Sequence, residues 1–127
     1  MKTTKLKVGG REFALLFDLN AMQAMEDGIK DFDLSKLSDY VRTPGGMLDI
    51  ITILAREGEE AEGRVLDVDK RWFGRHISPA PAKIANIHIV ILDTLREGLS
   101  METEDDDDTK EVDVVLEEIK KKETTAD

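Results

Sequence analysis

Apolar and polar side chains alternate between residues 5 and 17, on both sides of a pair of glycines. This alternation places successive side chains on opposite faces of an extended strand. Gly9 and Gly10 can adopt the positive φ angles that a tight turn between antiparallel strands requires. The sequence therefore predicts a β-hairpin with one face in water and one face on a core, the latter formed by Leu6, Val8, Phe13, Leu15 and Phe17.

After the hairpin, the apolar spacing changes to that of a helix. Asp18 is a predicted N-cap for a first helix that runs to about Asp27 and stops at Gly28. Because methionine packs well in irregular spaces, we expect the methionines of this helix to fill the core rather than to line a groove for a partner. The packed side of the helix is predicted to be formed by Leu19, Met22 and Met25.

Two further helices are predicted in the next part of the chain. Asp33 can cap a short helix over residues 34–40, and the Thr43–Gly46 segment, which contains proline and two glycines, is expected to break the chain. A helix should then begin at Met47 and end at Gly58, because its apolar residues follow the i, i+3, i+4, i+7 pattern. These residues are Met47, Ile50, Ile51 and Leu54.

A polar stretch over residues 59–63 is expected to be a linker. A short helix should follow it, because either Asp67 or Asp69 can act as an N-cap. This helix would carry Trp72 and Phe73, whose large aromatic surfaces predict a core anchor.

A long helix is expected to start near Pro81 and to close the folded body at Gly98. The elements together predict an α+β, mostly α fold in which an N-terminal hairpin packs on a small helical bundle. Residues 1–100 form a single folded domain in this prediction, and residues 101–127 form an acidic, flexible tail. The apolar row of the long helix is Ile84, Ile87, Ile91 and Leu95.

The acidic charge of the chain lies mainly in this tail. The whole chain carries a net charge of -10, and residues 101–127 hold twelve Asp and Glu residues against four Lys. The run from Glu102 to Asp108 cannot bury apolar surface, so we expect it to be solvated and disordered. Because binding to a phosphate backbone requires clustered Lys and Arg, no direct binding to nucleic acid is expected.

Four apolar residues near the C-terminus return to helical spacing. They lie between Lys110 and Lys122, with acidic residues toward the start and lysines at the end, as the helix dipole favours. A helix this short is marginal in water, so the segment either folds back onto the body or docks on a partner. Exposed apolar side chains on the helix from Met47 and the hairpin edge are further candidates for partner contact. The partner-binding candidates in the tail are Val112, Val115, Leu116 and Ile119.

No group of residues has the spacing of a catalytic, cofactor or metal site. The chain has no cysteine, and His76 and His88 have no second ligand at helical spacing, so no zinc site is predicted. Gly9–Gly10 and Gly45–Gly46 lack the pattern of a phosphate loop, and Asp105–Asp108 lacks the alternation and central glycine of a calcium loop. We expect His88 to be hydrogen-bonded and half-buried, His76 to be a surface residue, and the chain to be neither an enzyme nor a cofactor-binding protein.

The opening segment KVGGREFALLFDLNAMQAMEDG resembles the start of phage tail assembly chaperones. Members of that family have a hairpin with a turn of the Gly-Gly kind, then an aromatic-Asp-Leu-Asn-Ala run, and then a helix that ends in Glu-x-Gly. The layout of the later helices agrees over most of residues 5–100, whereas the acidic tail has no counterpart in this pattern. The matching residues are, in order, Phe17, Asp18, Leu19, Asn20, Ala21, Glu26 and Gly28.

The resemblance implies a small phage or prophage protein without enzymatic activity. It implies that the protein binds the tape measure protein, keeps it soluble and helps tail tube subunits gather around it in the bacterial host cytoplasm. The sequence agrees with that location, because no apolar run reaches the roughly 18 residues that a membrane span needs. Two alternatives remain: a structural tail or head-tail connector component, and an acidic inhibitor that imitates nucleic acid.

Overall fold

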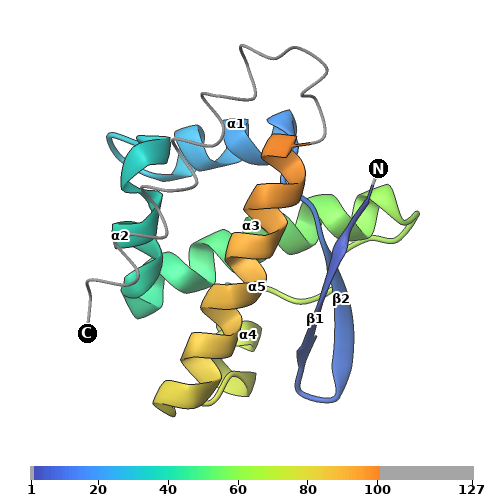
Figure 1. Ribbon diagram of the computed structural model, residues 1–127. Helices are drawn as coiled ribbons and strands as arrows, with labels where there is room; N and C mark the ends of the chain where they lie inside the picture. The colour runs from blue at the N-terminus through green and yellow to red at the C-terminus, as the bar shows by residue number, and fades with distance from the viewer. Residues whose placement is uncertain (1, 101–127) are drawn as a thin grey trace.

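Two strands, five α-helices and one 3-10 turn make up the part of the chain that the computed structural model describes, residues 2–100 (Figure 1). Met1 and residues 101–127 lie outside the described part. The predicted class is confirmed for the described residues, since the fold is α+β, mostly helical, with an N-terminal hairpin. The elements are β1 (Thr4–Val8), β2 (Arg11–Leu15), α1 (Leu19–Gly28), η1 (Leu34–Lys36), α2 (Leu37–Arg42), α3 (Pro44–Ala61), α4 (Lys70–His76) and α5 (Pro81–Ser100).

The hairpin forms as the alternation predicts. β1 and β2 are antiparallel, with Leu6 opposite Phe13. Gly9 and Gly10 make the turn with φ angles of 59° and 78°, a region that glycine enters without steric cost. The predicted apolar face is buried throughout, at Leu6, Val8, Phe13, Leu15 and Phe17.

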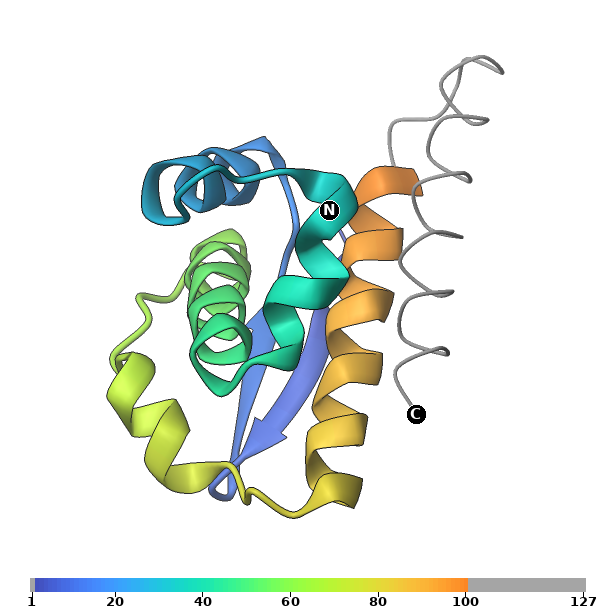
Figure 2. The same cartoon turned by 90° about the vertical axis from the view of Figure 1, so that its left-hand side faces the viewer.

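The opposite face of the hairpin is not fully in water, contrary to the prediction. Ala14 and Leu16 are also buried, because α3 packs along β2. A Cβ atom placed at Gly58 of α3 would lie only 2.1 Å from the carbonyl oxygen of Ala14, and the Leu16 N–H donates to the carbonyl oxygen of Leu54 over 3.0 Å. β1 packs against α5, so the hairpin lies between α3 and α5 (Figure 2).

α3 is longer than predicted at both ends. The predicted break between the helices is present but is limited to Thr43, which is extended between α2 and α3. The Thr43 hydroxyl accepts a hydrogen bond from a backbone N–H of the first turn of α3, and Pro44 occupies that turn itself. Gly58 does not end the helix, which continues to Ala61. Residues 59–63 are therefore not simply a linker, because their first part belongs to α3.

α1 begins where the sequence predicts. The Asp18 carboxylate accepts a hydrogen bond from the Ala21 N–H over 2.8 Å, which caps the helix, and Asp33 caps the next turn in the same way. Ala21 and Met25 are buried, but Leu19 is 78% exposed, so its predicted place on the packed side is wrong. Leu19 lies two residues before Ala21, about 200° away around the helix, and points outward.

The aromatic anchor on α4 is confirmed, with Asp69 as its cap. The Asp69 carboxylate accepts a hydrogen bond from the Trp72 N–H over 2.8 Å. Asp67 instead forms an ion pair with Arg11 at 2.7 Å. Phe73 is fully buried, and Trp72 packs edge-on against it with ring centroids 5.5 Å apart.

α5 starts at Pro81 as predicted but continues past Gly98. A Cβ atom at Gly98 would lie 2.1 Å from the carbonyl oxygen of Phe17. This glycine therefore marks a close contact between α5 and the segment after β2, and not the end of the helix. The predicted apolar row is buried at Ile87, Ile91 and Leu95, and it is half-buried at Ile84.

Candidate docking surface

Two candidate partner surfaces lie on the body. The predicted apolar row of α3 lies mostly in the core, with Met47 only 5% exposed and Ile50 fully enclosed, but Met47 and its neighbour Leu48 also line a groove. At the hairpin edge, the Ala14 N–H donates to Glu59 Oε2 over 2.9 Å. Partner contact at either surface stays a prediction. The tail candidates lie outside the described residues: Val112, Val115, Leu116 and Ile119.

Glu59 is a buried carboxylate that sequence reasoning missed, because its polar neighbours predict a linker. It is 6% exposed and accepts hydrogen bonds from Arg64 Nε at 3.0 Å and Nη2 at 2.8 Å. These bonds hold the pKa of Glu59 below its ordinary value, together with the bond from the Ala14 N–H and against the opposing effect of burial. The sequence did contain a signal that Glu59 is buried, because it lies four residues after Ala55, on the buried side of α3. Its role is structural, since it covers the strand edge.

An apolar groove lies where the start of α3, the end of α4 and the start of α5 meet. We name it the connector groove, because the link between α4 and α5 forms one of its walls. Its volume is about 150 Å³, and an apolar cavity of about this size accommodates a benzene-sized group. Met47 lets the groove adapt to different side chains, because methionine is flexible and polarisable. The apolar lining is formed by Pro44, Met47, Leu48, Ile77, Pro79 and Ile84.

A guanidinium group lies at the rim of the connector groove. Arg42 lines the groove, and its Nη1 atom is 3.7 Å from Asp39 Oδ1. Its Nε and Nη2 atoms are shielded from solvent and have no hydrogen-bond partner among the described residues. The positive charge of this guanidinium favours a carboxylate beside the groove. The groove therefore suits an apolar side chain that has an acidic neighbour.

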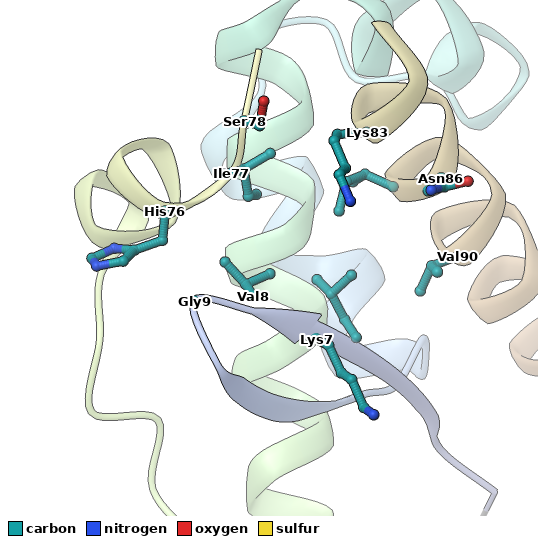
Figure 3. Close-up of a pocket in the computed structure, with 11 residues that line it drawn as sticks. Lys7, Val8, Gly9, His76, Ile77, Ser78, Lys83, Asn86 and Val90 are labelled. Carbon is teal, nitrogen blue, oxygen red and sulfur yellow. The ribbon is translucent and has the colours of Figure 1, made fainter. Parts of the chain in front are cut away.

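A wider depression lies on the other side of the same connector, between the hairpin turn and α5 (Figure 3). Its volume is about 390 Å³. Val8 and Val90 contribute apolar surface, while Lys7 and Lys83 add positive charge. The His76 ring stacks on Trp72, with centroids 4.1 Å apart. This mixed and open lining does not define one ligand chemistry, so the connector groove is the better candidate.

A polar network fixes the helices around the connector groove. The Tyr40 hydroxyl of α2 donates to Asp49 Oδ2 of α3 over 2.5 Å, and Lys70 Nζ of α4 is 2.6 Å from Asp49 Oδ1. Burial, helped by this hydrogen bond to the carboxylate, raises the pKa of Tyr40 to about 12. Burial also acts to raise the pKa of Asp49, but the bonds from Lys70 and Tyr40 outweigh it and hold that pKa below its ordinary value. The network thus joins the three helices by charge-assisted hydrogen bonds.

Both histidines bond to backbone carbonyl groups. His88 is half-buried, and its Nε2 donates to the Val41 carbonyl oxygen over 3.1 Å, as predicted. His76 is exposed, also as predicted, and its Nδ1 donates to the Trp72 carbonyl oxygen over 2.8 Å. Within residues 2–100 there is no group of three or more His, Cys, Asp or Glu side chains that could hold a metal ion.

Comparison with protein-family models, with curated proteins and with solved structures finds no match to this chain. Among the helices of the described body, none is long and apolar enough to cross a membrane. The candidate site therefore rests on the geometry of the described residues.

Proposed function

We propose that this chain is a binding protein without enzymatic activity that acts as a phage tail assembly chaperone. In this role it binds the tape measure protein in the bacterial host cytoplasm, keeps it soluble and helps tail tube subunits gather around it. The observation that carries the proposal is the connector groove, an apolar slot with the partly unpaired guanidinium of Arg42 at its rim. Such a slot suits one side chain from the apolar stripe of a helical partner.

Several of the residues that carry the family resemblance have structural roles in this fold, and this supports the proposal. Gly9 and Gly10 form the hairpin turn. Phe17 is buried, Asp18 caps α1, and Ala21 is a buried residue of that helix. These members of the family pattern thus help to build the hairpin and α1. A shared pattern at such positions supports a shared fold, and the function is carried by the groove.

The physical task of such a chaperone fits a small groove. A long, apolar, largely helical polypeptide aggregates unless its apolar stripe is covered before assembly. The covering must also be reversible, because the tail tube has to replace the chaperone. A groove of about 150 Å³ engages one side chain at a time, which gives modest affinity and fast release.

Coexpression with the tape measure protein of the same phage or prophage tests the proposal. We expect the wild-type chain to raise the soluble yield of that protein and to copurify with it. Leu48→Glu, which places a charge in the groove, should abolish both effects. Val65→Glu is the matched control, because Val65 is 84% exposed and lies outside the groove. It should behave like wild type.

A second variant separates loss of binding from loss of folding. Arg42→Glu reverses the charge at the groove rim without filling the slot, and it should weaken copurification while the fluorescence of Trp72 remains that of the folded chain. If the tape measure protein stays insoluble with the wild-type chain and nothing copurifies, the chaperone proposal fails. Detection of the chain in purified virions, in a fixed ratio to its neighbours, would then assign it to the tail structure.

A further inference from the structure

The two edges of the hairpin differ in how they are covered. On β2, the outward N–H of Ala14 donates to the side chain of Glu59 over 2.9 Å. On β1, the main-chain hydrogen bonds within the described body are those with β2 alone. α5 approaches the start of β1, where the hydroxyl groups of Thr4 and Thr94 are hydrogen-bonded, but it does not bond to the main chain of the strand.

The register identifies which main-chain groups of β1 point outward. In an antiparallel pair, residues that exchange hydrogen bonds alternate with residues whose N–H and C=O groups point away from the partner strand. Ala14 is of the second kind, because its N–H donates to Glu59 of α3. Lys5 lies opposite Ala14, and Lys7 is two residues further along β1. The N–H and C=O groups of Lys5 and Lys7 therefore point away from β2, and we name them the free edge.

The depression between the hairpin turn and α5 leaves room beside the free edge (Figure 3). Its volume is about 390 Å³, and its side chains alone define no single ligand. Lys7 is one of its lining residues, so the free edge adds a main-chain donor and acceptor there. An unpaired strand edge beside apolar surface is a template for one more strand. The apolar surface comes from Leu6, Val8, Ile87 and Val90.

Like charges oppose a second copy of this chain at the free edge. The outward groups belong to Lys5 and Lys7, and both residues are exposed. In an antiparallel pair of two copies, each of these lysines would therefore lie opposite a lysine of the other copy. Because like charges directly opposite each other destabilise a strand pair, the edge suits a different segment.

Positive charge beside the depression favours an acidic segment. Lys7 and Lys83 both line it, and neither forms an ion pair with another residue of the described body. Lys5 is paired with Glu62 at 2.6 Å, and Glu12 lies opposite Lys7 on β2. The two carboxylates lie near three lysines, so an excess of positive charge remains for an occupant.

We propose that the free edge of β1 binds an extended segment of a partner protein as an added strand, and that acidic and apolar residues alternate in this segment. Residues directly opposite each other in a sheet share a face. The acidic side chains thus lie beside Lys5 and Lys7, and the apolar side chains lie on the face of Leu6 and Val8. This site does not depend on the function proposed above, because it uses neither the connector groove nor a helical partner.

Titration of a short peptide into the isotope-labelled full chain, followed by NMR, tests the added strand. The probe is Glu-Val-Glu-Val-Glu with blocked ends. At a peptide concentration about tenfold above the Kd, hydrogen exchange of the Lys5 and Lys7 amides should slow by about tenfold. The amides of Leu6 and Val8 should change little, because they already face β2. The control peptide, Val-Val-Glu-Glu-Glu, has the same composition and charge without the alternation, and should bind at least about fivefold more weakly.

Two proline variants test the main-chain contact. Lys7→Pro removes an outward N–H but no bond to β2, and proline is tolerated in edge strands. We expect it to raise the Kd for the probe by about tenfold. Glu12→Pro is the matched control, because it makes the same change directly opposite, on the other edge of the hairpin. It should bind like wild type, and the fluorescence of Trp72 reports whether each variant is folded.

Lys7→Glu keeps the main chain and reverses the charge, so it should also weaken binding of the acidic probe. Three results would overturn the proposal. Equal affinity for the two peptides would reduce the interaction to unspecific charge attraction. An unchanged Kd for folded Lys7→Pro, or for Lys7→Glu if the proline variant does not fold, would exclude the free edge as the site. Slow exchange of the Lys5 and Lys7 amides before any peptide is added would show that the chain itself or a second copy already occupies the edge.

Discussion

Gly58→Ala tests the close contact between α3 and β2. The added Cβ atom would lie 2.1 Å from the Ala14 carbonyl oxygen and 2.6 Å from the Leu15 nitrogen. Ordinary contacts between carbon and other heavy atoms have a length of about 3.5 Å. The opposing atoms are backbone atoms of a strand, so they cannot rotate away, and the helix and hairpin must separate.

The expected loss of stability follows from two opposing terms. Overpacking in a core costs about 1–3 kcal/mol, and the backbone clash at Gly58 places it at the upper end of that range. Replacement of glycine by alanine inside a helix stabilises the folded state by about 1 kcal/mol. We therefore expect Gly58→Ala to lower the free energy of unfolding by about 2 kcal/mol.

Urea unfolding followed by the fluorescence of Trp72, the only tryptophan, measures this change. With an m-value of about 1–2 kcal/mol/M, the midpoint should fall by about 1–2 M. Gly45→Ala is the matched control in the same helix, because no atom lies within 4 Å of the position that its Cβ atom would take. It should leave the midpoint unchanged or raise it slightly. A Gly58→Ala midpoint equal to that of Gly45→Ala would refute the close-contact argument.

Two further predictions concern the hydrogen-bonded carboxylates of Glu59 and Asp49. Glu59→Gln should lower the free energy of unfolding by about 1–3 kcal/mol at neutral pH, because Arg64 and the Ala14 N–H lose a charged acceptor. Folding lowers the pKa of Glu59. The carboxylate therefore adds its full contribution to the free energy of unfolding above its ordinary pKa, and this contribution is lost as the pH falls through the lowered pKa. The urea midpoints of wild type and variant should therefore converge in acid. Asp49→Asn should lower the Tyr40 pKa from about 12, as measured by tyrosinate absorbance; an unchanged titration would refute the role of the carboxylate.

Local signals in the sequence were sufficient for most element positions. Apolar alternation and the glycine pair located the hairpin, and Asp18, Asp33 and Asp69 each cap a helical segment. These features act within a few residues, so a single sequence contains them. The fold class followed because the period changed from two to that of a helix after Phe17.

The errors arose where a residue serves a contact with a distant segment. Gly58 and Gly98 resembled helix ends, but each allows a backbone from another part of the chain to approach α3 or α5. Glu59 resembled a linker residue, but it caps the edge of β2 through Ala14. Such roles depend on tertiary neighbours, which no local pattern encodes.

Sequence patterns could not predict the connector groove, because it also depends on how distant segments pack together. α4 is short and is held to α3 at one end by the Lys70–Asp49 ion pair. Near its other end, Gly74 faces Leu48, and a Cβ atom there would lie 3.3 Å from Leu48 Cδ1. Gly74 thus lets α4 approach Leu48 closely, and the groove lies beside this contact, where α3, α4 and α5 meet. Its lining combines residues that are up to about forty positions apart in the chain, from Arg42 to Ile84, so only the folded chain brings its apolar walls together.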